Sequence, residues 1–189
     1  MASLPFFLVT PADEYGCGYY RMRWPFESLR RLGLAQGVIS PYFLDRQTLQ
    51  ELDPDVLICQ RVIEEQQIAR LTVMRKEISA MFIFDIDDLI TNMPVDNKYT
   101  SLFHKDTADK LKRAIGLCDR LVVSSPALAA AYGSFAPDVV VCPNSLPDKP
   151  WASLSGVRKL LWVSARALGE YQSPVLKERY RTTSKHSEH

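Results

Sequence analysis

Histidine, cysteine and glycine are scarce in this sequence, with three His, four Cys and eight Gly among 189 residues. Two of the histidines stand within the last four positions, and the cysteines are widely spaced with no Cys-x-x-Cys pair. These patterns exclude the usual zinc-binding spacings and a disulfide framework. We therefore expect reduced thiols, no metal site and a cytoplasmic protein.

Long apolar runs and an excess charge of one sign are also missing. The formal net charge is +1, which gives no basic footprint for nucleic acid. No apolar run approaches the roughly 18 residues that a membrane-spanning helix needs, and the N-terminus lacks the basic segment of a signal peptide. Nucleic-acid partners and transmembrane segments are therefore not expected.

The charge that is present divides the chain into two regions. Residues 1–153 carry 16 basic and 19 acidic side chains, whereas residues 154–189 carry 7 basic and 3 acidic ones. The second region also lacks sustained hydrophobic periodicity. We expect one folded domain over 1–153 and a basic, poorly ordered tail over 154–189.

Short apolar runs alternate with helical patterns along the first region. The expected helices start near Pro25, after Asp45, and at about residues 64, 106 and 126, with an irregular loop over 89–104. Strands separated by helices of this length indicate right-handed crossovers. The fold class is therefore α/β, a doubly wound, mostly parallel sheet with helices on both faces. The expected strands are 6–9, 38–39, 56–59, 81–84, 121–123 and 139–142.

Ligands bind beyond the carboxyl ends of the strands in such sheets, so the loops there are the candidate sites. The first loop, residues 15–25, contains Gly16, Gly18, Tyr20 and Arg21. Its glycines allow close approach of the backbone to a ligand, and an arginine can pair with phosphate. The dinucleotide fingerprint is incomplete, because the third glycine is absent. A plain turn followed by a solvated basic helix start is the alternative.

The second candidate loop contains Asp85, Asp87 and Asp88 directly after an apolar strand. Three carboxylates this close repel one another unless something compensates them, which favours a site. One candidate is an aspartate phosphotransferase that uses Mg²⁺, although the Gly-Thr expected after the second aspartate is replaced by Asp88-Leu89. Helix or turn caps are the alternative.

Two further loops carry small polar residues. Ser124 and Ser125 precede Pro126, where a helix cap is the default interpretation. Asn144 follows Cys142-Pro143 and can hold a turn through its own backbone.

Four segments, in this order and spacing, resemble the N-terminal half of bacterial group-1 glycosyltransferases over about residues 5–151. They are Gly16-Cys17-Gly18-Tyr19-Tyr20-Arg21, Asp85-Ile86-Asp87-Asp88, Leu117 to Ser125, and Val141-Cys142-Pro143-Asn144-Ser145. The resemblance implies the two-domain GT-B fold, with the acceptor held mostly by the N-terminal domain and the nucleotide sugar by the C-terminal one. It also implies metal-independent chemistry without a cofactor, so the aspartates would be cleft carboxylates.

The resemblance stops near Trp151, because the Gly-rich strand and paired glutamates of the donor-binding domain are not found. Read one base out of frame with permitted codons, residues 166–171 can encode Gly-His-Trp-Gly-Asn-Ile, which is similar to the opening of that second domain. We therefore expect a truncated domain with a frameshifted remnant after it.

The resulting hypothesis is the acceptor-side domain of a retaining glycosyltransferase, inactive alone. It would be cytoplasmic or peripheral to the inner membrane, and its partners would be a sugar or glycolipid acceptor and, through a second domain, a nucleotide-sugar donor. Its cleft would contain the nine candidate residues Gly16, Gly18, Tyr20, Arg21, Asp85, Asp87, Asp88, Ser124 and Asn144. Self-association through the uncovered interdomain surface is expected. The alternative is a non-catalytic, flavodoxin-like module that binds a small ligand or a partner.

Overall fold

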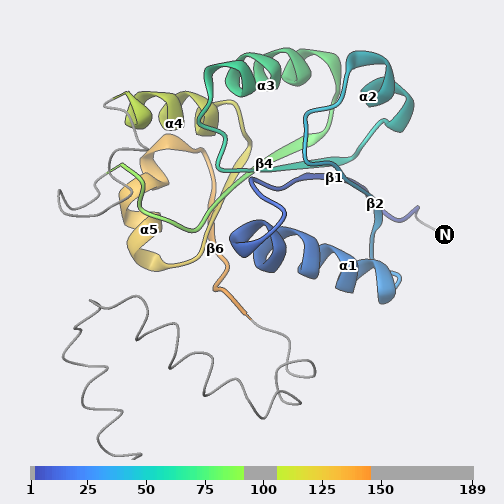
Figure 1. Ribbon diagram of the computed structural model, residues 1–189, viewed down its shortest axis with the longest axis horizontal. Helices are drawn as coiled ribbons and strands as arrows, with labels where there is room; N and C mark the ends of the chain where they lie inside the picture. The colour runs from blue at the N-terminus through green and yellow to red at the C-terminus, as the bar shows by residue number, and fades with distance from the viewer. Residues whose placement is uncertain (1–2, 92–105, 146–189) are drawn as a thin grey trace, which may run out of the picture. The chain divides into compact units, whose positions relative to one another are not determined.

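The computed structural model describes residues 3–91 and 106–145, which belong to one compact unit, Met1–Ser145. The domain boundary expected at residue 153, the tail over 154–189 and most of the loop over 89–104 lie outside the described residues. Within the described part, six strands form one parallel sheet in the order β2-β1-β3-β4-β5-β6 (Figure 1). The strands are β1 (Phe6–Thr10), β2 (Gln36–Ile39), β3 (Val56–Gln60), β4 (Met81–Ile86), β5 (Arg120–Val123) and β6 (Val139–Val141).

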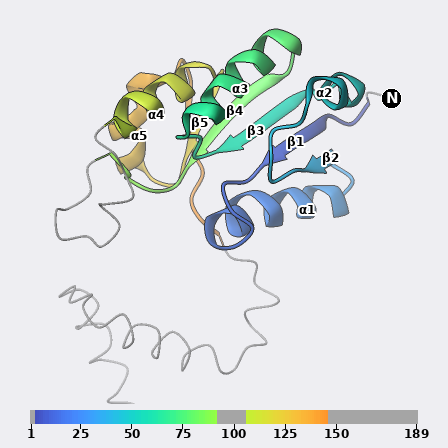
Figure 2. The same cartoon turned by 45° about the horizontal axis from the view of Figure 1, so that its top comes forward.

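The helices cover the two faces of this sheet unequally. A π-helical turn, η1, leads directly into α1, and both lie on one face, whereas the other helices lie on the opposite face (Figures 1 and 2). The α/β, doubly wound arrangement expected from the sequence is thereby confirmed. The helices are η1 (Gly18–Arg23), α1 (Trp24–Arg31), α2 (Arg46–Leu52), α3 (Glu65–Glu77), α4 (Thr107–Gly116), α5 (Pro126–Tyr132) and the 3₁₀ turn η3 (Gly133–Phe135). None of these described helices is long and apolar enough to cross a membrane.

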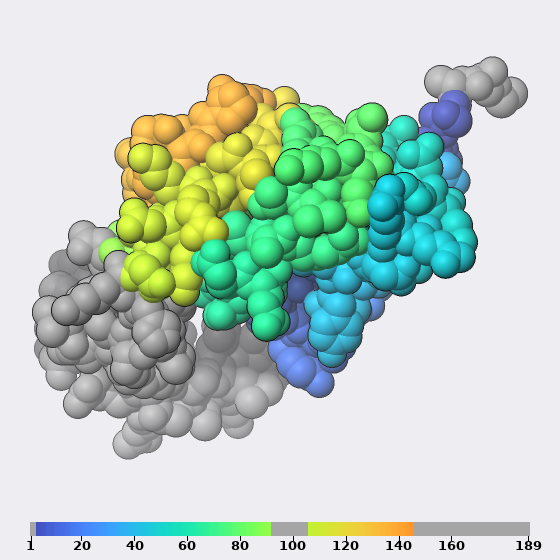
Figure 3. All heavy atoms as spheres, turned by 90° about the horizontal axis from the view of Figure 1, so that it is seen from above, coloured from blue at the N-terminus to red at the C-terminus, as the bar shows by residue number. Residues whose placement is uncertain are grey.

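The larger core lies between the sheet and the helices α2 to α5. Leu8, Leu57 and Phe82 are in register on three adjacent strands and are fully buried. Leu71 of α3 and Leu111 of α4 belong to the same buried cluster, and Figure 3 shows α2, α3 and α4 side by side over this face. Burying a side chain of this size stabilises the fold by roughly 1.5–3 kcal/mol, so this face is the main source of stability.

The smaller core lies under α1. Phe26 packs on Phe7 with a distance of 6.0 Å between ring centroids, and Met22 and Val9 complete the cluster. Leu29 and Leu32 follow Phe26 at helical spacing, which places the three on one side of the helix. Leu29 and Leu32 are nevertheless 37% and 70% exposed.

The first candidate loop also differs from expectation. From Gly18 onward it is π-helical, and the Trp24 amide donates to the Tyr19 carbonyl. A Cβ on Gly18 would lie 1.9 Å from the Asp13 carbonyl oxygen. Glycine is therefore needed here so that the start of η1 can approach the backbone of Asp13. Single π-helical turns occur frequently at functional sites.

The strand order places a reversal at the boundary between β1 and β3. The chain moves outward from β1 to β2 and then crosses back over β1 to β3, from which it continues in the other direction. Ligands of open parallel sheets bind in the crevice at such a reversal, beyond the carboxyl ends of the strands. The residues that follow β1, β3 and β4 are therefore the candidates for a ligand site.

Substitution of Gly37 tests the close approach of β2 to β1. Gly37 pairs with Phe7 at a φ of +140°, and a Cβ there would lie 1.9 Å from the Phe7 carbonyl oxygen. Gly37→Ala should lower the free energy of unfolding by at least ~3 kcal/mol, because it combines backbone strain with a clash against backbone. The measurement is urea unfolding followed by circular dichroism.

Gly116→Ala is the matched control, because a Cβ on Gly116 in α4 meets no atom within 4 Å. That variant should be neutral or more stable by up to about 1 kcal/mol. Equal effects at the two glycines would contradict the close approach of β2 to β1.

Candidate functional site

The candidate site lies at the carboxyl edge of the sheet. Its side chains come from the segment between β1 and η1, from η1 itself, from the ends of β3 and β4, and from the residues that follow β6. They form two groups, a buried junction around Arg21 and a partly open cluster around Asp87.

The junction is an ion pair between Arg21 of η1 and Asp85 of β4. Arg21 Nη2 lies 2.5 Å from Asp85 Oδ2, and Arg21 Nε lies 2.9 Å from Asp85 Oδ1. The two side chains are only 4% and 2% exposed. A charge buried this deeply is tolerated only when it is paired and hydrogen-bonded, so each residue depends on the other.

The same guanidinium also holds the segment after β6. Arg21 Nη1 donates to the Cys142 carbonyl oxygen at 3.0 Å and to Asn144 Oδ1 at 2.7 Å. Gln60 of β3 donates from Nε2 to Asp85 Oδ1 at 3.3 Å, and its Oε1 accepts from the Ala12 amide. Four separate segments are therefore joined through one buried pair.

Burial has the largest influence on the pKa of each charged group in the junction. It raises the pKa of Asp85, while Arg21 and Gln60 oppose that rise by stabilising the carboxylate. For Arg21, burial works toward a lower pKa, but Asp85 outweighs it and the pKa is raised. Because an arginine stays protonated in proteins, the junction is a charged but electrically neutral pair.

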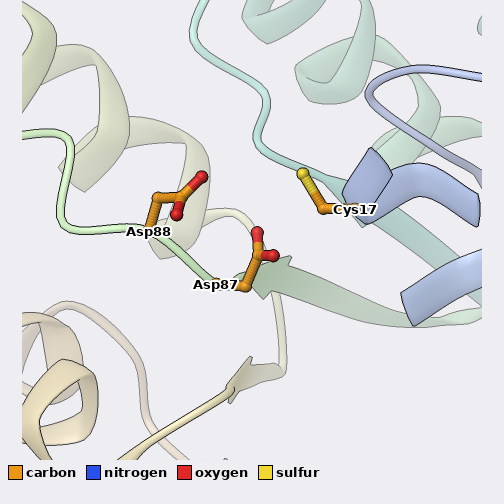
Figure 4. A group of neighbouring side chains, drawn as sticks. All are labelled: Cys17, Asp87 and Asp88. Atoms are coloured by element: carbon orange, nitrogen blue, oxygen red, sulfur yellow. The ribbon is translucent and has the colours of Figure 1, made fainter. Parts of the chain in front are cut away.

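The cluster contains Cys17, Asp87 and Asp88. The thiol and one oxygen of each carboxylate lie within 4.8 Å of one another, and Figure 4 shows the three side chains facing a common space beyond the end of β4. Asp87 Oδ1 is buried and has no hydrogen-bond partner among the described residues. Cys17 and Asp87 are partly buried, whereas Asp88 is exposed.

Arg61 partly compensates the negative charge of this cluster. Its guanidinium lies 3.2 Å from Asp13 Oδ2, 3.6 Å from Asp88 Oδ2 and 3.6 Å from Cys17 Sγ. Arg61 follows β3 directly and has a φ of +47°. A left-handed backbone is uncommon for residues other than glycine and is found repeatedly at functional sites.

Burial and like charge shape the protonation of the cluster. Burial raises the pKa of Asp87, and Asp88 and Asp85 raise it further. Burial, together with Asp87, raises the pKa of Cys17 to about 11, so the thiol stays protonated at neutral pH. Only the two carboxylates are therefore hard ligands for a divalent cation, and the expectation of a metal-independent site stays a prediction.

The nine candidate residues divide between the two groups. Tyr20, Arg21, Asp85 and Asn144 line one pocket on the α1 face of the sheet. Asp87 and Asp88 belong to the cluster, and Ser124 Oγ donates to the Asp87 carbonyl oxygen at 3.2 Å. Gly16, at a φ of +53°, and the buried Gly18 flank Cys17.

Other expectations from the sequence fall at the two ends of β5. Ser125 caps α5 by accepting from the Leu128 amide, as expected. Asp119 precedes β5 at its amino end, where it binds Arg75 and accepts from the Phe82 amide at 2.8 Å. This part of the third resembling segment therefore lies at the edge of the sheet away from the site.

Sequence reasoning missed four residues that shape the site: Asp13, Cys17, Gln60 and Arg61. Gln60 and Arg61 carried a usable signal, because two polar residues follow an apolar strand there, as they do after β4. Cys17 belongs to the first resembling segment but had no signal of its own, and Asp13 had none, since their contacts with Arg61 depend on the fold.

No protein-family model, curated protein or solved structure matches this chain. The functional interpretation therefore depends on the geometry of the site and on the resemblance described above.

The buried pair makes a specific prediction for stability. Arg21→Met leaves the Asp85 charge buried without its partner, so we expect a loss of about 3–5 kcal/mol in the free energy of unfolding. The double variant Arg21→Met/Asp85→Leu removes both charges and should recover most of that loss. Denaturant unfolding of the three proteins measures the difference.

Arg113→Met is the control, because Arg113 pairs with Glu65 on the surface, where both side chains are more than half exposed. It should leave the unfolding midpoint unchanged. A double variant as unstable as Arg21→Met would show that the junction does not act as a pair.

For Asp87 we expect the opposite effect on stability, a gain when the charge is removed. The pKa of Asp87 is raised in the folded state, so the protein loses stability as pH rises through that value. Asp87→Asn should therefore stabilise the domain at pH 7, by less than about 1 kcal/mol because water partly screens the group. The gain should vanish below the ordinary aspartate pKa, where the parent carboxyl is itself protonated.

Thermal unfolding of Asp87→Asn at pH 7 and pH 3.5 measures this dependence. Glu14→Gln is the control, since Glu14 is exposed and lies outside the cluster, and it should show no gain at either pH. A loss of stability in Asp87→Asn at pH 7 would mean that a partner satisfies Asp87.

Proposed function

We propose that the described domain is the acceptor-binding half of a nucleotide-sugar-dependent glycosyltransferase, and that this unit by itself does not transfer sugar. One observation carries the proposal. Arg21, Asp85 and Asn144 come from three of the four segments on which the resemblance depends, and they are joined by the hydrogen bonds of a single guanidinium. Contact between segments 64 and 123 residues apart supports the view that they serve one site.

The charge of the site supports the acceptor side over the donor side. Among the described residues of this edge, Asp13, Asp87 and Asp88 are opposed by one cation, Arg61, because Arg21 and Asp85 neutralise each other. This edge therefore has an excess of negative charge, which repels a diphosphate. A polyol is suited to it, because carboxylates accept hydrogen bonds from hydroxyl groups.

In the intact enzyme, an acceptor hydroxyl would attack the anomeric carbon of the donor sugar. The new bond joins the acceptor oxygen to that carbon, the bond from the carbon to the diphosphate oxygen breaks, and the hydroxyl proton passes to the departing diphosphate. Asp87 and Asp88 would orient acceptor hydroxyls for this attack. Positive groups that stabilise the departing diphosphate belong to the donor-binding domain.

A non-catalytic binding module is the second candidate, and one observation favours it. Both charged groups of the junction are saturated by each other and by neighbouring groups, which leaves them structural rather than reactive. The same observation disfavours the aspartate phosphotransferase, because both Asp85 oxygens are already engaged by Arg21.

Saturation-transfer NMR on the full chain tests the proposal with two probes, methyl α-glucopyranoside and uridine diphosphate. The glycoside should receive saturation and the nucleotide should not. Asp88→Asn should weaken glycoside binding roughly tenfold, since a hydrogen bond to a charged group contributes about 1.5–3 kcal/mol. Glu51→Gln is the control, because Glu51 is an exposed residue of α2.

Binding of the nucleotide without the glycoside would contradict the acceptor assignment. Transfer of glucose from uridine diphosphate glucose to the glycoside by this chain alone would contradict the proposed lack of activity. Glycoside binding with no activity after a donor-binding domain is supplied would favour the second candidate.

A further inference from the structure

A pocket of about 360 Å³ lies on the α1 face of the sheet, beside the Arg21–Asp85 junction. Its size is within the roughly 300–1,000 Å³ typical of small-molecule sites. The pocket is distinct from the Asp87 cluster, because neither Asp87 nor Asp88 lines it.

The lining of this pocket is mostly aliphatic. Ile58, Ile83 and Val122 come from the adjacent strands β3, β4 and β5, and all three side chains are only partly buried. Parallel sheets normally have both faces covered, yet among the described helices only η1 and α1 lie on this face. The walls are Met22, Pro25, Tyr20 and Pro143.

The polar groups of the lining restrict the ligand further. Among the described residues that line the pocket, only Arg21 and Asp85 are charged, and they neutralise each other. A charged ligand would therefore be buried without a partner, which is strongly unfavourable. Asn144 and Ser145 are exposed at the rim and can hydrogen-bond a polar end of a ligand.

We propose that this pocket binds the apolar portion of an uncharged amphiphile, with the polar end of the ligand at Asn144 and Ser145. The identification of that amphiphile as the acceptor rests on the proposed function. The acceptor would then have two parts, an aliphatic or aromatic group against Ile83 and Val122 and a hydroxylated head at the carboxyl edge.

The test uses the full chain and N-phenyl-1-naphthylamine, a neutral apolar dye that fluoresces in apolar sites. Dye emission should rise and saturate with protein concentration. Octyl β-glucopyranoside, below its critical micelle concentration, should displace the dye, whereas methyl glucopyranoside should not.

Val122→Phe fills the pocket and should weaken dye binding at least tenfold. Ile83→Phe is a second filling variant with the same expected effect, used if the first does not fold by circular dichroism. Val73→Phe is the matched control, because Val73 is 45% exposed on α3 and lies on the opposite face of the sheet. It should bind the dye like the parent protein.

Several results would overturn the proposal. They are no dye uptake by the full chain, dye binding unchanged in both filling variants, and dye that octyl glucopyranoside does not displace. Light scattering that shows a dimer dissociated by Val122→Phe would identify a second copy of the chain as the occupant instead. Failure of the proposed function is distinguishable, since loss of methyl glucopyranoside binding at the edge leaves dye binding in the pocket intact.

Discussion

The organisation of the carboxyl edge depends on the buried ion pair between Arg21 and Asp85. Asp85 lies in β4 between the buried apolar residues Phe84 and Ile86, and without Arg21 its charge would oppose folding of the strand. Arg21 reaches it only because η1 turns the chain back over the sheet immediately after β1. The position of η1, the end of β4 and the segment after β6 are therefore fixed by one contact.

This pair also separates two environments that lie close together. On one side, the described residues that line the pocket are mostly apolar, and the two charged ones, Arg21 and Asp85, neutralise each other. On the other, Asp13, Asp87 and Asp88 exceed the charge of Arg61, and Asp87 has a buried oxygen without a described partner. The carboxyl edge therefore combines an apolar surface with a neighbouring region of excess negative charge.

The fold could be predicted from the sequence because its strands are short apolar runs. Val56–Gln60 and Met81–Ile86 are buried on the face covered by α2 to α5 and partly buried on the other, so runs of Val, Leu, Ile and Phe mark them directly. The exposure of Leu32 could not be predicted, since helical periodicity identifies an apolar stripe without showing how far the sheet extends beneath it. The π-helix was hidden because Gly16 and Gly18 are equally typical of a loop.

Several residues of the site could be predicted from the sequence, but the contacts between them could not. The aspartates after β4 were evident, but the partner of Asp85 is 64 residues away in the chain, and spacing alone cannot identify a contact of that range. Asp13 and Arg61 were missed for the same reason. Their roles depend on how close the ends of β1 and β3 come, which only the strand order establishes.

The strand order has a consequence for biosynthesis. β1 is translated first, yet it lies inside the sheet between β2 and β3. It can pair with β2 once residue 39 has emerged from the ribosome, but its other edge stays open until β3 has emerged as well. During that interval an apolar strand has an unpaired edge, the condition under which nascent chains associate wrongly. A ribosome that pauses before β3 has emerged would therefore prolong a stage at which the nascent chain is prone to associate.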